Sequence, residues 1–210
     1  MRKFIPEKTK LIPEEANLVF HGKIYDVYQW PQEMYDGSTE TFEMLRRPDT
    51  VKIIAVLTPE EQKRLKNVQD LSVEEAGDKI VITRQIQPRK DWFYDYPGGR
   101  TDKADANELE AAKREMREES GLELQNWKLV AVEQPFTKID WLSYTFLATG
   151  LTGQSGQSLD AGEKIEVELA TLEKIEELAK TDESQYLRFR DSIKINSIDQ
   201  LKKLSGLYNY

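Results

Sequence analysis

The first fifty residues consist of a polar arm followed by two strand patterns. Residues 1–16 are mostly charged or polar and predict an irregular arm. Bulky apolar residues then recur through residues 18–30, as is typical of a strand, and residues 39–45 supply a return strand. Asp36 and Gly37 between them are a strong hairpin turn signal. Because an isolated hairpin is marginally stable in water, we expect this one to pack on the rest of the chain or on a second copy.

The next part of the chain predicts two strands separated by a polar segment. The β-branched run at residues 51–57 is typical of a buried strand, and residues 79–85 form the following one. Thr58 favours a helix N-cap, with Pro59 at the first helical position. Residues 58–77 are otherwise polar and charged, and we assign them no function.

The C-terminal half combines strands with short helices. Residues 150–162 are rich in Gly, Ser and Gln, which is typical of a mobile loop. Strands are predicted at residues 127–132, 144–148 and 163–167, and helices starting after Thr171 and Ser197. Strands on both sides of a central helix fit an α/β fold, an α/β/α sandwich around a mixed sheet, with the hairpin as an N-terminal antiparallel extension. We divide the chain into residues 1–50, the arm and hairpin, and residues 51–210, the α/β domain.

The central helix ends at Gly121, which tolerates the positive φ of a helix stop. Asn107 is a plausible N-cap with Glu110 as its capping-box partner, and Asp105 with Glu108 offers a second register. An apolar stripe that can face a core is formed by Leu109, Ala112 and Met116. Residues spaced by three and four are neighbours on a helix, so three carboxylates project from one side: Glu115, Glu118 and Glu119.

This carboxylate side has two interpretations from the residues alone. In the first, the carboxylates belong to a solvent-exposed helix face that is stabilised by ion pairs. Arg114 lies four residues after Glu110 and four before Glu118, so it can pair with either. Alternatively, oxygen-rich carboxylate clusters suit divalent cations such as Mg²⁺, Mn²⁺ or Ca²⁺.

Composition excludes several classes of protein. A net charge of −8 argues against a nucleic-acid partner. The absence of cysteine excludes disulfides, zinc–thiolate sites and a cysteine nucleophile. The single histidine, His21, falls in a strand and turn pattern, so a general base is expected among carboxylates, lysines or tyrosines. The N-terminus has charges and prolines where a signal peptide has an apolar run. No stretch is long and apolar enough for a membrane span. We therefore expect a cytoplasmic protein with no membrane partner.

Residues 98–122 read Gly-Gly, a polar loop and then R-E-M-R-E-E-S-G-L. This order resembles the Nudix box of the Nudix hydrolases. The resemblance implies a loop, helix and loop in which glutamates hold Mg²⁺ or Mn²⁺ ions that activate a diphosphate. It assigns metal binding to Glu115, Glu118 and Glu119, with Gly98 contributing its carbonyl.

The segment departs from the Nudix box at one position. A glutamate normally precedes the arginine by eight residues, and Ala106 stands there. The spacing from Gly99 to Arg114 is also one residue longer than the pattern. Either Asp105 or Asp102 can substitute across the extra residue.

Other segments are similar to the ADP-ribose pyrophosphatase group of this family. They are the hairpin, K-I-V-I-T-R-Q, Pro97-Gly98-Gly99 and the late E-x-I-E-V, and the match covers most of residues 18–180. The resemblance implies hydrolysis of ADP-ribose to AMP and ribose 5-phosphate by a homodimer that exchanges its N-terminal β-element. The alternatives are another nucleotide-sugar or dinucleotide polyphosphate as substrate, or a non-catalytic nucleotide-sugar sensor. The three glutamates together argue against the sensor.

Glu118 and Glu163 are the candidate catalytic residues. Glu163 follows the loop at residues 150–162 and resembles the family's late glutamate, so it is the candidate base or an additional metal ligand. Three basic residues near the box are candidates for substrate phosphates, with solvated loop charges as the alternative: Arg84, Arg89 and Arg100. The aromatic cluster at residues 92–96 is expected to be buried, with one ring available to stack on a nucleobase.

Overall fold

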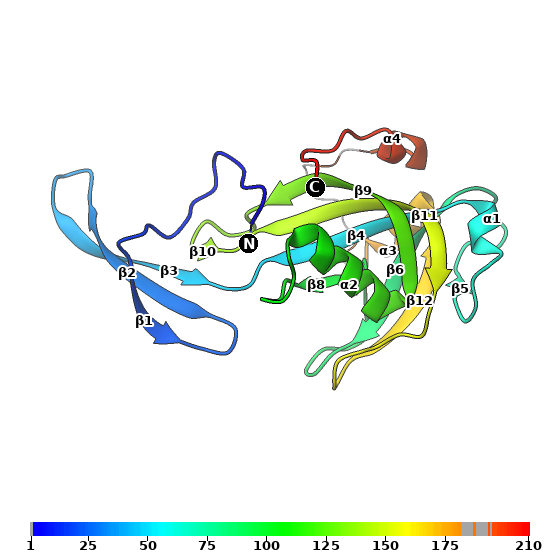
Figure 1. Ribbon diagram of the computed structural model, residues 1–210, viewed down its shortest axis with the longest axis horizontal. Coiled ribbons are helices and arrows are strands. Elements are labelled where there is room, and N and C mark those ends of the chain that lie inside the picture. Colours follow the sequence, from blue (N-terminus) through cyan, green and yellow to red (C-terminus); the bar gives the residue numbers. More distant parts are fainter. Residues whose placement is uncertain (1, 182–186, 188–192, 194) are drawn as a thin grey trace.

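The computed structural model describes residues 2–181, 187, 193 and 195–210, and in these residues the strands form two sheets (Figure 1). The larger sheet has eight described strands: β4 (Thr50–Leu57), β5 (Gln69–Asp70), β6 (Lys79–Ile86), β7 (Phe93–Asp95), β8 (Gly98–Arg100), β9 (Leu122–Glu133), β11 (Ser143–Gln154) and β12 (Lys164–Ala170). The smaller sheet has four in the described residues: β1 (Asn17–His21), β2 (Asp26–Glu33), β3 (Thr39–Arg46) and β10 (Ile139–Asp140). The helices of the described part are α1 (Pro59–Gln62), α2 (Glu108–Ser120), α3 (Leu172–Leu178) and α4 (Ile198–Lys202).

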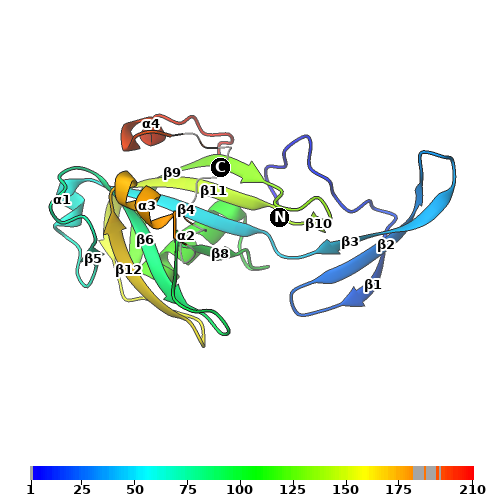
Figure 2. The ribbon, with the colours of Figure 1, turned by 180° about the vertical axis from the view of Figure 1, so that it is seen from behind.

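The larger sheet is mixed and is covered on both faces. Its main path runs β5-β12-β6-β4-β11-β9, with β7 paired to β6 and β8 to β4. β11 is parallel to β4 and β12 to β5, whereas β9 is antiparallel to β11. Helix α2 lies in front of the sheet in Figure 1, and the view from behind brings α3 to the front (Figure 2). The expected α/β/α sandwich around a mixed sheet is therefore confirmed.

Alternation along β4 divides the core between the two faces. Ile53 and Leu57 belong to the buried cluster that includes Met116 of α2. Ile54 belongs to the cluster on the other face, together with Ile175 of α3. Successive side chains of a strand point to opposite faces, so a strand covered on both sides must be apolar throughout. This explains the uninterrupted apolar run that identified the strand.

The smaller sheet extends away from the larger one (Figure 1) and corrects one prediction. Residues 18–30 form two strands, because a turn at Gly22 closes with a hydrogen bond from its amide to the carbonyl of Tyr25. The N-terminal element is thus a three-stranded meander, to which β10 adds in parallel beside β3. The turn at Asp36 and Gly37 is confirmed, with Gly37 at a φ of 82°.

Residues 150–162 also correct a prediction. Gly150 to Gln154 continue β11 instead of starting a loop, and Leu151 pairs with Leu124 of β9. Glycine-rich composition favours a loop, but hydrogen bonding to β9 decides the conformation here. The connection to β12 therefore begins only at Ser155.

The polar segment after β4 is a small layer at the edge of the larger sheet. The side-chain oxygen of Thr58 caps α1, and Glu61 completes the capping box, as Thr58 and Pro59 predicted. The segment includes β5, which pairs with β12. No helix in the part of the chain that the structure describes has both the length and the apolar character needed to cross a membrane.

A buried ion cluster joins the two sheets. The Arg2 guanidinium donates to Asp49 at 2.6 Å and to Asp140 at 2.7 Å, and Arg46 donates to the other oxygen of Asp140 at 3.0 Å. Asp140 is only 2% exposed, so it depends on these two arginines for compensation. The N-terminal arm therefore belongs to the junction between the sheets.

Gly121 provides a test of the backbone between α2 and β9. Its φ is +72°, and a Cβ there would lie 2.3 Å from the carbonyl oxygen of Ser155. Gly121→Ala should lower the free energy of unfolding by at least about 1–2 kcal/mol, the cost of a left-handed non-glycine residue, and by more because Ser155 must move. Gly37→Ala is the control, since its φ is +82° with no atom within 4 Å, and it should lose only the left-handed cost of about 1–2 kcal/mol. Urea denaturation measures both, and equal losses would contradict the crowding at Gly121.

Candidate active site

Helix α2 carries the carboxylates and is fixed at both ends. The Asn107 side chain accepts a hydrogen bond from the amide of Glu110 at 3.0 Å, so the Asn107 register is the one adopted. Gly121 is left-handed, and its amide donates to the carbonyl of Arg117. These caps satisfy backbone groups that a helix leaves unpaired, and they set where the carboxylates of the last two turns point.

Strand β8 brings its backbone against the carboxylate side of α2. A Cβ at Gly98 would lie 2.2 Å from the carbonyl oxygen of Val51, and one at Gly99 would lie 2.6 Å from the Glu115 carboxylate. The two glycines therefore permit a close approach that other residues would block. The amide of Gly98 donates to Glu119 at 2.8 Å, which ties the strand directly to the helix.

The Arg114 guanidinium is the centre of the ion-pair network. Its Nη1 donates to Glu115 and to Glu118, each at 2.8 Å. Its Nε and Nη2 donate to both oxygens of Asp105, at 3.0 and 2.9 Å, and Nη2 also donates to the carbonyl of Arg100 at 2.9 Å. The hydrogen bonds to Arg114 lower the pKa of Asp105, and the same contacts raise the pKa of the arginine.

Asp105 is thus the acidic partner of the box arginine, and Asp102 is not. Asp102 instead donates its amide to Asp105 at 2.7 Å and so orients that carboxylate. Asp105 lies one position before Ala106, and it forms an ion pair with Arg114 at 2.9 Å.

The carboxylates of α2 lie near Glu163, at the start of β12. Burial raises the pKa of Glu115 to about 7, although the charge and hydrogen bond of Arg114 lower it. The charges of Glu118 and Glu163 add to the rise. Burial also raises the pKa of Glu119 well above its usual range, and the charges of Glu115 and Glu163 contribute. Burial, followed by the charge of Asp160, raises the pKa of Glu163. More carboxyl groups are therefore crowded here than the single guanidinium of Arg114 can compensate.

The residues of this cluster fit a divalent metal ion. The donors are all oxygens, which hard cations prefer. Within the described residues, no three acidic or histidine side chains converge on one point as they stand. The reason is that Arg114 lies between Glu115 and Glu118, while Glu119 is turned to the amide of Gly98. A cation bound here would be held by Glu115, Glu118 and Glu119, with the Gly98 carbonyl.

The three candidate phosphate-binding arginines lie in different surroundings. Arg100 is exposed on β8, and its charge lowers the pKa of Glu163, which places it beside the cluster. Arg84 pairs with Glu166 at 3.1 Å and lies 4.4 Å from the Trp92 ring centroid. Arg89 is exposed in the turn after β6.

Sequence reasoning missed one acidic neighbour of the site. Burial raises the pKa of Asp95, whose charge in turn raises the pKa of Glu119. Asp95 also pairs with Lys52 of β4 at 3.4 Å. The aromatic run around Asp95 predicts a strand but gives no sign that this carboxylate lies near α2. The pairing of β7 with β6 brings Asp95 to that position. The expected burial of that run is confirmed for Phe93 and Tyr96.

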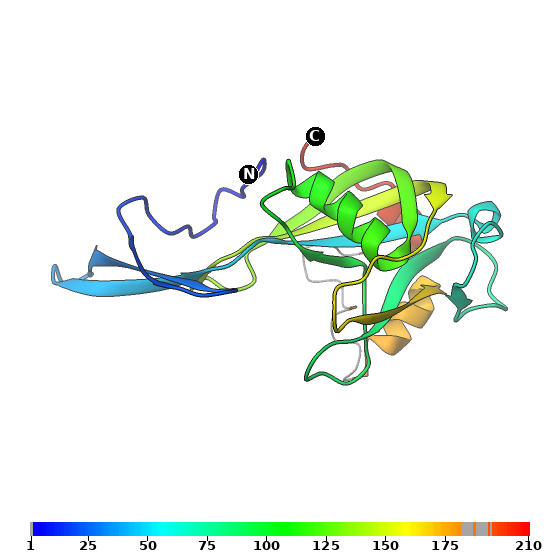
Figure 3. The same ribbon diagram turned by 60° about the horizontal axis from the view of Figure 1, so that its bottom comes forward.

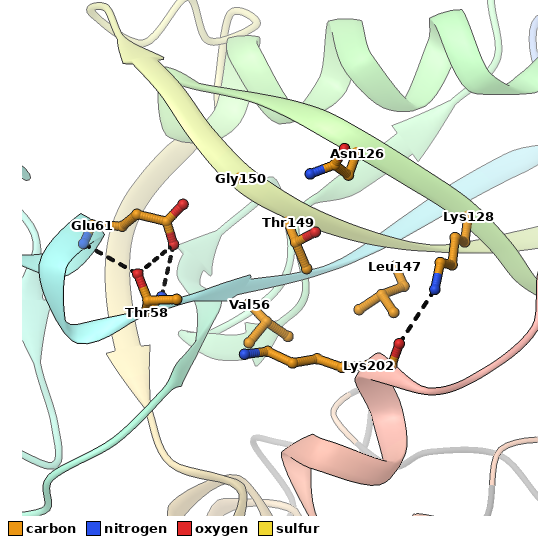
Figure 4. Close-up of a pocket in the computed structure, with 9 residues that line it drawn as sticks. All are labelled: Val56, Thr58, Glu61, Asn126, Lys128, Leu147, Thr149, Gly150 and Lys202. Carbon is orange, nitrogen blue, oxygen red and sulfur yellow. Dashed lines mark hydrogen bonds between the residues drawn. The ribbon is translucent and has the colours of Figure 1, made fainter.

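A pocket of about 340 Å³ is lined by other residues, which Figure 4 shows. Its floor includes Val56 and Leu147, which belong to the face of the sheet opposite α2. Its charged groups are already engaged, since Glu61 accepts from Thr58 and Lys202 pairs with Asp78. The acidic cluster, and not this pocket, is therefore the candidate active site.

Comparisons with known proteins agree with this assignment. The family model described as NUDIX domain matches residues 63–190. An ADP-ribose pyrophosphatase of Bacillus subtilis (strain 168) is 27% identical over 204 residues, which cover 91% of this chain and 97% of the relative. A solved structure described as an ADP compounds hydrolase matches with a TM-score of 0.57 and 14% identity, over 81% of this chain and 83% of that chain, and this likeness shows the fold alone.

The raised pKa of Glu115 predicts how stability depends on pH without metal. The unfolded carboxyl ionises near its ordinary value of 4.5 and the folded one near 7, so the folded state binds more protons between these values. The free energy of unfolding should therefore fall as pH rises from about 4.5 to about 7. Glu115→Gln should flatten this fall by on the order of 1–3 kcal/mol. Denaturation with chelator across this range measures the effect.

The control for this experiment is Glu40→Gln, at an exposed position on β3. It should leave the pH profile of the wild-type protein unchanged. A Glu115→Gln profile parallel to that of the wild type would contradict the buried, charge-crowded environment of Glu115.

Proposed function

The chain belongs to the NUDIX family, since the family model matches more than half of its residues, and on this basis we propose that it hydrolyses ADP-ribose to AMP and ribose 5-phosphate. As a Nudix pyrophosphohydrolase it acts on nucleoside diphosphates linked to another group. The observation that carries the proposal is the cluster of Glu115, Glu118 and Glu119 against Gly98, in which Glu119 is buried and the other two are partly exposed. The choice of ADP-ribose is supported by the name of the Bacillus subtilis relative.

The carboxylates of α2 are proposed to hold the metal ion that the reaction requires. When bound, Mg²⁺ or Mn²⁺ would supply positive charge to neutralise the anionic diphosphate and to activate water. Glu115, Glu118 and Glu119 would supply the carboxylates that hold it, and Arg114 donates from one nitrogen to both Glu115 and Glu118. Crowded carboxyl groups on α2 are thus a property of the free protein, and a bound cation would favour their ionised forms.

Glu163 is proposed as the general base. Water attacks one phosphorus, its proton passes to the Glu163 carboxylate, and the bond from that phosphorus to the bridging oxygen breaks. A base works best when its pKa lies near the working pH, and burial together with Asp160 shifts the pKa of Glu163 upward. Arg100, beside Glu163, is suited to contact a phosphate oxygen, and Arg84 and Arg89 remain proposed contacts farther along the substrate.

Another nucleotide-sugar or a dinucleotide polyphosphate is the alternative substrate, because each has the same diphosphate chemistry. A screen of such compounds with Mg²⁺, with products identified, distinguishes them. A sensor without activity is disfavoured because the three glutamates are retained together.

We also propose that residues 1–50 mediate a homodimer. β1 lies at the edge of the smaller sheet and exposes apolar side chains on both of its faces, with Val19 51% and Phe20 61% exposed. An exposed apolar edge strand is a template for pairing with another chain. Exchange of this element between two copies would cover that edge.

Light scattering at micromolar concentration should therefore give the mass of a dimer for the wild type. Val19→Glu should shift the mass to that of a monomer, because it places a charge in the apolar edge. Val73→Glu is the matched control, since Val73 is 76% exposed on the segment after α1 and should leave the dimer intact. A monomeric wild type would refute this assembly.

Glu118→Gln tests the metal-dependent reaction. It should lower the turnover of ADP-ribose by roughly 10²-fold or more, because a ligand of the activating cation is lost. Excess chelator should abolish the wild-type activity. Glu110→Gln is the control on the same helix, where Glu110 pairs with Lys113 at the surface, and it should keep full turnover. Full activity of the wild type in chelator would sink the proposal.

A further inference from the structure

The connection between β11 and β12 is attached to the end of the carboxylate helix. In Figure 3 this yellow segment runs past the end of α2 on its way to β12. The amide of Ser155 donates to the carbonyl of Gly121 at 2.7 Å, and the amide of Ser158 donates to the carbonyl of Glu118 at 2.9 Å. The last carbonyls of a helix lack partners within it, and here the connection supplies them.

One side chain in the connection, Gln157, links both ends of the site. Its amide nitrogen donates to the carbonyl of Glu119 and, at 3.1 Å, to the carbonyl of Ile165. Glu119 is a carboxylate of the candidate site, and Ile165 lies two residues after Glu163. The two hydrogens of a single NH₂ group therefore connect the helix to the start of β12.

The stretch from Gln157 to Ile165 is a closed loop around Glu163. Ile165 is only 5% exposed and anchors the start of β12 in the core. The amide of Glu163 donates to the carbonyl of Asp160 at 3.1 Å, which closes a turn just before the strand. The position of the Glu163 backbone relative to α2 thus depends on the Gln157 bridge and the Ser158 amide at one side and on the β12 ladder at the other.

We propose that Gln157 is a positioning residue that holds Glu163 at its working distance from the carboxylates of α2. This inference rests on the proposed function, in which Glu163 is the base. Small displacements of a catalytic group cost much more in turnover than in substrate binding. Loss of the bridge should therefore lower kcat and leave KM nearly unchanged.

The matched comparison is Gln154, three residues earlier on the same segment. Its side chain also bridges backbone, accepting from the amide of Lys66 and donating to its carbonyl, each at 2.9 Å. That bridge attaches the end of β11 to the segment after α1 and does not reach α2. Gln154→Ala removes the same number of hydrogen bonds without touching the link to Glu163.

The experiment compares Gln157→Ala, Gln157→Glu and Gln154→Ala in the full chain with Mg²⁺ and ADP-ribose. Glutamate keeps the shape of glutamine but, when ionised, has no hydrogen to donate to either carbonyl. Both Gln157 variants should lose about 10–100-fold in kcat, as is typical when a supporting contact of a site is removed, with KM within about threefold. Gln154→Ala should keep its kcat. Equal losses at both glutamines would overturn the proposal.

A double variant tests whether the effect passes through Glu163. If Gln157 acts by positioning that carboxylate, Gln157→Ala should cause almost no further loss in a Glu163→Gln background. Additive losses in the double variant would overturn the proposal.

Hydrogen exchange separates this proposal from the proposed function. Without substrate, amides of residues 158–165 should exchange faster in Gln157→Ala than in the wild type or Gln154→Ala. Unchanged exchange would show that the bridge does not hold the loop, even if the wild type hydrolyses ADP-ribose. If these amides exchange faster in Gln157→Ala but the wild type cleaves no diphosphate, the bridge is supported and the function assigned to Glu163 is refuted.

Discussion

Repulsion among the carboxylates near α2 is the constraint on which the rest of the site depends. Arg114 contacts Asp105, Glu115 and Glu118, each at 3.0 Å or less, so one cation is shared among three anions. Burial removes the water that would otherwise screen them, and the pKa of Glu115 rises to about 7 as a result. A charge arrangement of this kind persists only on a rigid support. The two helix caps, the close approach of β8 and the connection bound to the end of α2 supply that support.

Much of the fold and the centre of the site could be predicted because their signals are local. The caps of α2, its apolar stripe and its row of glutamates all lie within fifteen residues of one another. Turn residues such as Asp36 and Gly37 and the apolar run of β4 are likewise complete within a short window. Periodicity then placed three carboxylates on one side of a helix without knowledge of its surroundings.

The features that escaped prediction depend on partners far along the chain. Gly150 to Gln154 became a strand because β9 provides the other half of the ladder, which their own composition does not indicate. The choice of Asp105 over Asp102 required the reach of Arg114, and spacing alone left both open. Gln157 carries no local signal, since its two acceptors lie 38 and 8 residues away and an exposed glutamine fits any loop.

The ion cluster between the sheets has a consequence for how the chain is completed on the ribosome. Arg2 is synthesised 138 residues before its partner Asp140. The junction cannot close until both have emerged, although α2, with its carboxylates, is already outside by then. Segments that are synthesised before their partners remain exposed to non-native contacts until those partners emerge. The arm and the apolar edge of β1 are therefore the part of the nascent chain most in need of protection during synthesis.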